Sequence, residues 1–337
     1  MAPPRWRRGR LPVLQPGLPP GKRPRRRADP LLGRLFRAGG RASALLPPGV
    51  RYGLARAGGT AGYGLLPGLR RQALQNYAGI LHLAPDSPAV RRVAREAIVG
   101  YSKLIADFLA LSELSREDVM RMVDWRGWEH IQAGLAEGKG IIVVTPHFGN
   151  WDMAAAAAAA RGLKVTAVTD RYGNEDLNTR VTAARERFGI RVVPLTTSAA
   201  RAVLAALRRN EVAALVCDLA KEGRNVEVLV CGQKARVPAG PAVLALRSGA
   251  PVVPVMCRRQ ADNRYLLEVQ PPIDTPRTGD QEVDTRVLAQ AIMDRFEPEL
   301  LRLPEQWYLF SPMWLGEPGP RRPGVAQGDA GGAVPVS

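Results

Sequence analysis

Residues 141–160 read IIVVTPHFGNWDMAAAAAAA, and this stretch decides the fold. The β-branched run at its start is typical of a buried strand, and the methionine with seven alanines at its end is a strong helix former. His147 and Asp152 lie between the two, where Gly149 permits a tight turn. The stretch therefore predicts a histidine and an acid at the carboxyl end of a strand, where open α/β sheets bind ligands.

Short β-branched runs alternate with helical patterns through the rest of the chain. Strands are predicted at 141–145, 165–169, 192–195, 213–217 and 252–256, with helices such as 178–188 and 199–209 between them. A long amphipathic helix at 90–111 precedes the strands, and a helix at 287–303, interrupted at Pro298, follows them. This order predicts an α/β fold in which a mostly parallel central sheet is flanked by helices, with an N-terminal helical layer.

Charge and composition divide the chain into three parts. The 337 residues contain 48 Lys and Arg against 31 Asp and Glu, a net charge of +17, and the 46% hydrophobic content is enough for a packed core. Residues 1–30 carry nine basic residues and one acidic residue among many prolines and glycines. We therefore expect a disordered basic tail at 1–30, a folded domain at 31–315 and a second disordered tail at 316–337.

The basic surplus points to an anionic partner. A membrane surface and a nucleic acid both fit it, but aromatic residues make up only 6% of the chain and no nucleic-acid-binding module is recognisable, so nucleic acid is the weaker interpretation. Residues 31–69 are apolar, rich in glycine and studded with arginine. They suit helices in a membrane interface or ordinary amphipathic helices on the core. No window reaches the ~18 consecutive apolar residues of a membrane-spanning helix, and no export signal is recognisable.

Several classes of enzyme site are excluded by motif. The three cysteines, Cys217, Cys231 and Cys257, form no CxxC pair and suit a reduced cytosolic protein, so no metal site is expected. The chain contains no GxSxG nucleophile elbow and no Walker lysine loop. Glycines at 138 and 140 precede a strand instead of following one, which argues against a dinucleotide site.

Three histidines limit any mechanism that uses imidazole, and only His147 follows a predicted strand. On one regular helix, His147 and Asp152 would point about 140° apart. If His147 instead precedes the helix in a turn, the Asp152 carboxylate can reach back to Nδ1 of the imidazole. Nε2 would then be free to take a proton from an alcohol.

The segment 145–152, preceded by Gly138-Lys139-Gly140, resembles the HX4D/E block of bacterial lysophospholipid-type acyltransferases. The nearest branch is that of the lipid A lauroyl/myristoyl acyltransferases and the phosphatidylinositol mannoside acyltransferases. Further similar blocks occur in the same order, at 185–189, 238–246, 249–255 and 304–307. The resemblance extends from about Leu31 to Trp314.

This resemblance implies that residues 31–315 form an acyltransferase domain. His147 would deprotonate a hydroxyl of a membrane glycolipid or lysolipid, Asp152 would orient His147, and the alkoxide would attack an acyl thioester. The donor would be an acyl-CoA or an acyl carrier protein, whose acidic surface would suit the basic chain, and no cofactor or metal would take part. The enzyme would lie peripherally on the cytoplasmic face of the cell membrane.

Six further residues are expected to bind substrate. Asp218 ends the predicted strand 213–217 and matches an acidic position of the family, and Arg185 lies in one of the similar blocks. Arg224 lies in a Glu-Gly-Arg segment similar to a phosphate-binding motif of glycerol-phosphate acyltransferases, or in a charged surface loop. The others are Asn150, Arg171 and Arg236. The acceptor, the chain length and the donor stay open, and the alternative is a non-catalytic basic protein that binds membranes or nucleic acid.

Overall fold

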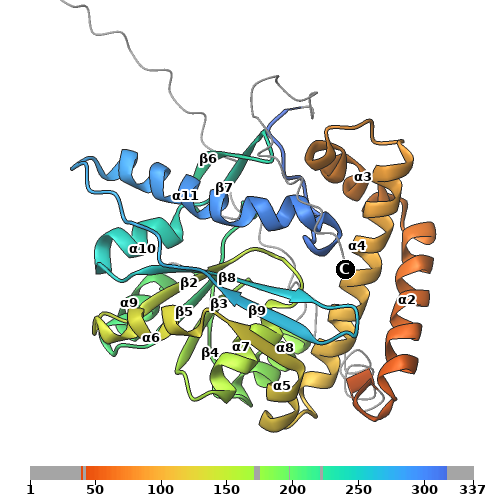
Figure 1. The fold of residues 1–337 in the computed structure, drawn as a ribbon, viewed down its shortest axis with the longest axis horizontal. Helices are drawn as coiled ribbons and strands as arrows, with labels where there is room; N and C mark the ends of the chain where they lie inside the picture. Colours follow the sequence, from red (N-terminus) through yellow and green to blue (C-terminus); the bar gives the residue numbers. More distant parts are fainter. Residues whose placement is uncertain (1–38, 41–42, 171–174, 197, 221–222, 317–337) are drawn as a thin grey trace, which may run out of the picture.

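The computed structural model describes residues 39–40, 43–170, 175–196, 198–220 and 223–316. A seven-stranded sheet crosses the centre with helices on both faces (Figure 1). Its strands run in the order β1-β9-β8-β2-β5-β3-β4, and a separate hairpin, β6-β7, lies outside it. The strands are β1 Val123–Arg126, β2 Ile141–Thr145, β3 Val165–Thr169, β4 Arg191–Pro194, β5 Val212–Val216, β6 Asn225–Val230, β7 Gln233–Pro238, β8 Val252–Arg259 and β9 Tyr265–Val269.

Five parallel strands of the sheet end at the same edge. The five strands β8, β2, β5, β3 and β4 are mutually parallel, so their carboxyl ends share an edge. β9 runs antiparallel to β8, and β1 runs parallel to β9. The helices are α2 Pro48–Leu65, α3 Pro67–Leu81, α4 Pro88–Leu111, α5 Arg116–Met122, α6 Trp128–Ala136, α7 Trp151–Ala160, α8 Glu175–Glu186, α9 Ala199–Arg208, α10 Gly240–Ser248 and α11 Gln281–Arg302, followed by the 3-10 turn η1 Pro304–Gln306.

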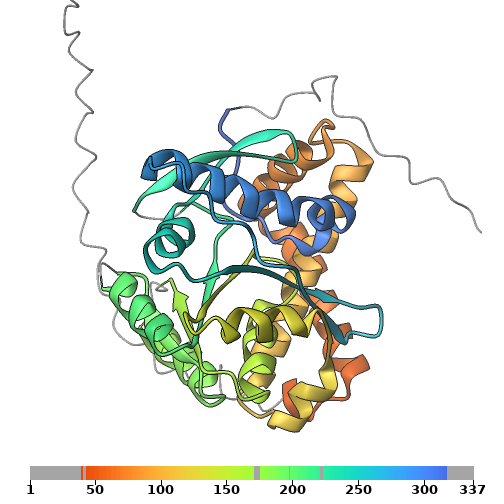
Figure 2. The same ribbon diagram turned by 60° about the vertical axis from the view of Figure 1, so that its left-hand side comes forward.

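Alternate residues of β2 face the two halves of the core. Ile141 packs among side chains of α5, α6, α7 and α8, whereas Ile142 and Val144 pack among those of α3, α9, α10 and α11. Both faces are apolar because β2 is a central strand covered on each side. Figure 2 shows α10 and α11 on the opposite side of the sheet from α7 and α8. The predicted α/β class and mostly parallel sheet are confirmed.

The last helix of the chain is continuous, although an interruption was expected. The helix expected at 287–303 with an interruption at Pro298 is the continuous helix α11, which passes through Pro298. Pro298 has no backbone N–H, so it cannot donate to the carbonyl of Asp294 one turn earlier. Both residues lie on the exposed side of the helix. Phe296 and Leu300 are buried on the other side, so packing keeps the helix intact while water can satisfy the free carbonyl.

Three helices at the N-terminal side form the expected helical layer. α2 packs on α4, and Gly59 makes the contact close, because a Cβ there would lie 2.7 Å from Cα of Val99. The predicted tail 1–30 and residues 317–337 lie outside the described residues, as do 31–38. Within the described part of the chain, no helix is both long enough and apolar enough to cross a membrane.

Candidate active site

A tight turn delivers His147 to the carboxyl edge of the sheet. β2 ends at Thr145 and α7 begins at Trp151, so His147 lies in the connection. Gly149 has a φ of +59°, and a Cβ at this position would lie 1.8 Å from the carbonyl oxygen of Cys257. Only glycine fits such a close approach with positive φ. The turn expected from the sequence is therefore formed, and the backbone of β8 limits its shape.

The imidazole of His147 pairs with Asp218. Its Nδ1 lies 2.6 Å from Oδ1 of Asp218, and its backbone N–H donates to Oδ2 at 3.0 Å. β2 and β5 are neighbours with Thr145 opposite Val216, so His147 and Asp218 each lie two residues beyond a register pair. Parallel pairing thus brings together two residues that are 71 positions apart.

Asp218 is a fully buried carboxylate with three donors. Besides His147, the indole N–H of Trp307 donates to its Oδ2 at 2.7 Å, and its side chain has no solvent exposure. Burial alone would raise the pKa of this carboxyl group. The charge that the His147 ring carries when protonated, together with the hydrogen bonds from His147 and Trp307, outweighs burial and holds the pKa of Asp218 below its ordinary value. Asp218 is therefore an anion placed behind the imidazole.

This pairing leaves the other ring nitrogen open. An ionised carboxylate only accepts hydrogen bonds, so Nδ1 of His147 carries a hydrogen, and in the neutral form of the ring Nε2 presents a lone pair. Among the described residues, Nε2 has no hydrogen-bond partner, and 25% of the His147 side chain is exposed. The ring of Trp151 packs edge-on against the imidazole with centroids 5.0 Å apart. The arrangement suits a general base.

Asp152 has a different partner from the one expected. Its Oδ1 accepts from Nε of Arg185 at 2.7 Å, and both side chains are about nine-tenths buried. The contact with Nδ1 that the sequence predicts for Asp152 is made by Asp218 instead. Asp152 is the second residue of α7, and there its carboxylate points to α8 and not back to the turn. The Asp152–Arg185 pair links these two helices.

The remaining predicted residues fall into three groups. Asn150 is buried, and its Oδ1 accepts from the backbone N–H of Met153, which caps α7. Arg224 precedes β6 and is exposed, while Arg236 of β7 pairs with Glu227 of β6 at 3.0 Å on the surface. Neither arginine bonds to His147 or Asp218. Arg171 lies outside the described residues.

A C-terminal segment for which the sequence predicts no role holds the turn in place. The N–H of Tyr308 donates to the carbonyl of His147 at 2.8 Å, and the N–H of Gly149 donates to the carbonyl of Gln306 at 2.9 Å. Trp307 between them reaches Asp218. The run PEQW at 304–307 is similar to the family, but its position, about 160 residues after His147, gives no sign of this contact.

A cleft of about 470 Å³ adjoins the same segment. Gln306 and Tyr308 line it together with Lys103 of α4, Arg258 of β8 and Arg302 of α11. Burial and the nearby charge of Arg259 lower the pKa of Lys103. Arg258 and Arg302 both pair with Glu299, so Lys103 is the more available cation of this cleft, which adjoins the segment that holds the turn.

The cysteines do not offer a nucleophile. Cys217, Cys231 and Cys257 are all buried, and burial raises the pKa of each thiol, that of Cys257 to about 12. A thiolate is the reactive form, so these side chains are unsuited to forming a covalent acyl intermediate.

Known proteins include relatives that cover most of this chain. Over 285 residues, 84% of this chain and 91% of the relative, the chain is 28% identical to a phosphatidylinositol mannoside acyltransferase of Mycolicibacterium smegmatis (strain ATCC 700084 / mc(2)155). It is 29% identical over 274 residues, 80% of this chain and 81% of the relative, to the protein of the same name from Mycobacterium tuberculosis (strain CDC 1551 / Oshkosh). The profile of the family described as bacterial lipid A biosynthesis acyltransferase matches residues 30–316. The chain is an acyltransferase and belongs to this family.

Proposed function

We propose that this acyltransferase moves a fatty acyl chain from an acyl thioester to a hydroxyl of a membrane glycolipid or lysolipid, with His147 as the general base. The observation that carries the proposal is the His147–Asp218 pair at the carboxyl edge of the sheet, which leaves Nε2 without a partner among the described residues on a side chain that is 25% exposed. A base in this position typically contributes ~10²–10⁴ in rate.

The chemical step follows from the pairing of His147 with Asp218 through Nδ1, which leaves Nε2 for the substrate. Nε2 of His147 takes the proton of the acceptor hydroxyl while the oxygen attacks the thioester carbonyl. Asp218 stabilises the imidazolium that forms. When the carbon–sulfur bond breaks, the imidazolium returns the proton to the leaving thiolate, so the histidine ends the cycle neutral. The transfer is direct, and neither a cofactor nor a metal takes part.

Asp152 supports this step indirectly. Its bond to Arg185 fixes α7 against α8, and α7 begins directly after the turn that carries His147. We assign Asp152 and Arg185 a positioning role, because their charges are engaged with each other below the surface. Arg171, Arg224 and Arg236 remain candidates for holding substrate phosphates.

The acceptor is proposed from the relatives. Both mycobacterial relatives are named for phosphatidylinositol mannoside, so a glycolipid with a sugar hydroxyl is the first acceptor to test. The donor is an acyl-CoA or an acyl carrier protein. Family membership and the carboxylate behind His147 favour this enzyme over a non-catalytic protein that binds membranes or nucleic acid.

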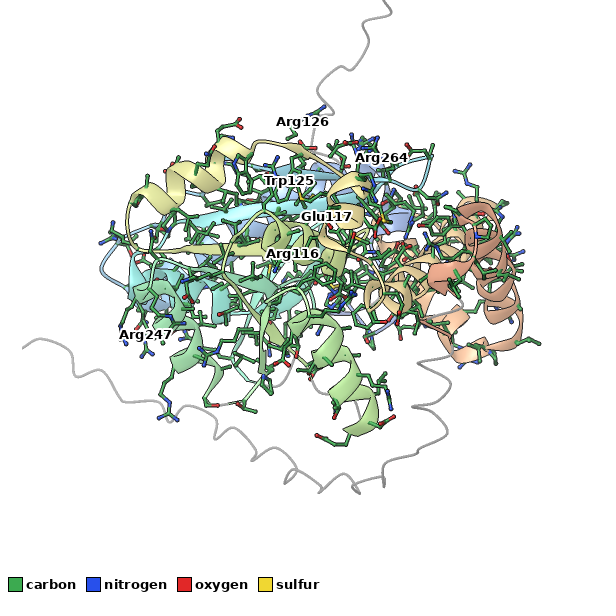
Figure 3. All side chains as sticks on the ribbon, turned by 90° about the horizontal axis from the view of Figure 1, so that it is seen from below. Arg116, Glu117, Trp125, Arg126, Arg247 and Arg264 are labelled. Atoms are coloured by element: carbon green, nitrogen blue, oxygen red, sulfur yellow. The ribbon has the colours of Figure 1, made fainter. Side chains whose placement is uncertain are left out.

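A peripheral position on the cytoplasmic face of the membrane fits the surface of α2. Val50, Leu54 and Leu65 are exposed and lie within about 60° of one another around the helix axis. An apolar stripe of this kind with basic residues nearby suits insertion into an anionic interface. Basic groups elsewhere are spread over the surface: Figure 3 shows Arg126, Arg247 and Arg264 projecting from different elements.

Acyl transfer from labelled donors to purified lipids tests the proposal. We expect the wild-type protein to acylate phosphatidylinositol mannosides or another glycolipid, as measured by mass spectrometry, and His147→Gln to lose at least ~10²-fold in rate. His130→Gln is the matched control, because His130 lies on α6 away from the site. Both variants should still bind vesicles. Equal transfer by His147→Gln and wild type would refute the role of His147.

A further inference from the structure

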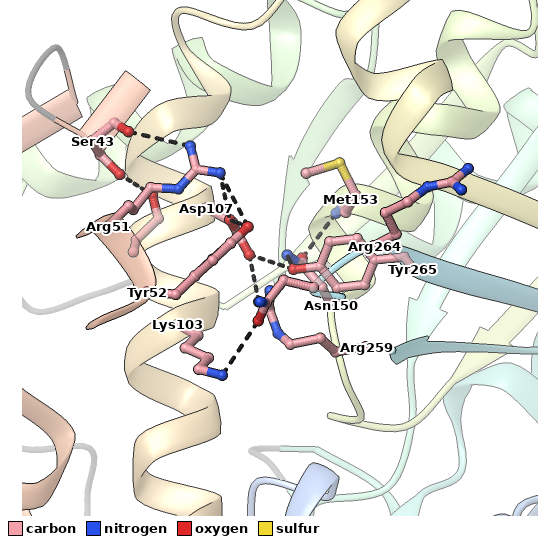
Figure 4. A network of polar contacts seen from close by, with 12 residues as sticks. Ser43, Arg51, Tyr52, Lys103, Asp107, Asn150, Met153, Arg259, Arg264 and Tyr265 are labelled. Atoms are coloured by element: carbon pink, nitrogen blue, oxygen red, sulfur yellow. Dashed lines mark hydrogen bonds and ion pairs between the residues drawn. The ribbon is translucent and has the colours of Figure 1, made fainter. Parts of the chain in front are cut away.

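A buried polar network connects α4 with the turn that carries His147 (Figure 4). At its centre lies Asp107 of α4, whose side chain is 1% exposed. Its Oδ2 accepts from the hydroxyl of Tyr265 and from Nη2 of Arg259, and its Oδ1 accepts from the hydroxyl of Tyr52 at 2.7 Å. The network therefore joins α2, α4, β8 and β9 through one carboxylate.

The network ends on Asn150. The hydroxyl of Tyr265 accepts from Nδ2 of Asn150 at 2.9 Å, while Oδ1 of the same amide accepts from the backbone N–H of Met153 at 2.9 Å. The backbone N–H of Asn150 donates to the carbonyl of Cys257. Both ends of this buried amide are occupied, so its orientation determines whether α7 is capped.

The carboxylate of Asp107 fixes the direction of these bonds. As an anion it can only accept, so the proton of the Tyr265 hydroxyl points to Asp107 and the oxygen lone pair points to Asn150. Burial and the charge of Asp107 raise the pKa of Tyr265, so the hydroxyl keeps its proton. Asn150 must then present Nδ2 to Tyr265 and Oδ1 to the start of α7.

We propose that Asp107, acting through Tyr265 and Asn150, is a positioning residue for His147. The proposal rests on the proposed role of His147 as the base. The turn 147–150 is held from one side by Asp218, Gln306 and Tyr308. The Asn150 side chain ties its other end to the helical layer. Loss of that tie lets the amide rotate and shifts the imidazole relative to the substrate.

Two tyrosine variants separate positioning from stability. Tyr265→Phe removes the hydroxyl between Asp107 and Asn150, and Tyr52→Phe removes a hydroxyl from the same carboxylate on the side away from Asn150. Each loses one buried hydrogen bond to Asp107, so we expect similar falls in Tm. Only Tyr265→Phe should lower kcat, by about 10-fold to 10²-fold with KM for the thioester within about two-fold, because a small misplacement of a catalytic group has this effect.

A nuclear magnetic resonance measurement follows the imidazole directly. The chain has three histidines, so ring signals of ¹³C-histidine-labelled protein can be assigned with His147→Gln and His130→Gln. Tyr265→Phe should shift the His147 signals, and Tyr52→Phe should leave them in place. This readout does not need activity, so it tests the positioning even if no thioester is accepted and the proposed function fails.

Asn150→Ser provides a second route if Tyr265→Phe does not fold. Serine still caps a helix but does not extend to Tyr265. The same fall in kcat and the same shift of the His147 signals are expected. Unmoved signals and unchanged kcat in a folded Tyr265→Phe or Asn150→Ser protein would overturn the proposal. The proposal would also be overturned if Tyr52→Phe lost as much kcat as Tyr265→Phe, with both losses following the fall in Tm.

Discussion

At the scale of single residues, the chemistry depends on which acid stands behind His147. Asp152 and Asp218 are both buried and both paired, yet only Asp218 contacts Nδ1. Asp152 neutralises Arg185 instead. The two carboxylates therefore have separable effects, one on the protonation of the base and one on the contact between α7 and α8.

We predict that Asp218→Asn lowers kcat on the order of 10⁴-fold, because an amide can donate to Nδ1 and move the imidazole hydrogen to Nε2. Asp152→Asn is the control: it should lower the free energy of unfolding by about 1–3 kcal/mol through its weaker bond to Arg185, with a smaller loss of kcat. Histidine ring signals report the tautomer, which should change only in Asp218→Asn. An unchanged tautomer in Asp218→Asn would contradict this assignment.

The sequence predicts the position of His147 but not its partner. The run at 141–145 and Gly149 define the strand and turn because both signals are local. Asp218 was recognised as an acid at the end of a strand, yet its pairing needs the register of β2 on β5, which sequence periodicity does not specify. Asp152 was favoured for its closeness in sequence, although its helix directs it to Arg185.

At the scale of elements, the connection between β2 and α7 is the most constrained turn of the site. Gly149 touches the carbonyl of Cys257, whereas Gly138, in the turn before β2, has a similar positive φ of +72° but open space around it. The two glycines therefore separate the cost of backbone conformation from the cost of steric collision.

We predict that Gly138→Ala lowers the free energy of unfolding by about 1–2 kcal/mol, the cost of a left-handed conformation alone. Gly149→Ala should lower it by more and abolish transfer, because the new Cβ pushes the turn away from β8 and displaces His147. Denaturant unfolding monitored by circular dichroism and the transfer assay measure both effects. If Gly149→Ala and Gly138→Ala lose the same free energy of unfolding and Gly149→Ala keeps its activity, the turn adapts to the new Cβ and the prediction is wrong.

The sequence did not predict the strands β1 and β9 or the hairpin β6-β7. β1 is four residues long and pairs in parallel with β9, more than 140 positions later in the chain, whereas β9 and the hairpin β6-β7 are formed by antiparallel pairing between neighbouring strands. β2 and β3, in contrast, begin and end at the predicted residues, because central parallel strands are continuous apolar runs. The edge strand β9 matters for the site, since it carries Tyr265.

At the scale of the whole molecule, the helical layer couples surface and site. α2 presents an apolar stripe to solvent and places Arg51 and Tyr52 in the network around Asp107. α4 carries Asp107 and lines the cleft beside η1. α4 thus contacts both α2 and η1, the 3-10 turn next to His147, so it links the apolar stripe to the candidate site (Figure 1).

We predict that two sequence features contribute to membrane binding in different ways. Removal of residues 1–30, with a net charge of +8, should weaken binding to anionic vesicles at low salt and matter less at high salt, because exposed charges act over only ~8–10 Å near physiological ionic strength. Leu54→Glu with Leu65→Glu should weaken binding at both salt concentrations, because it removes apolar contact. Leu195→Glu, after β4, is the control and should bind normally. Vesicle co-sedimentation measures all three. Full binding by the α2 double variant at high salt would place the membrane contact elsewhere on the molecule.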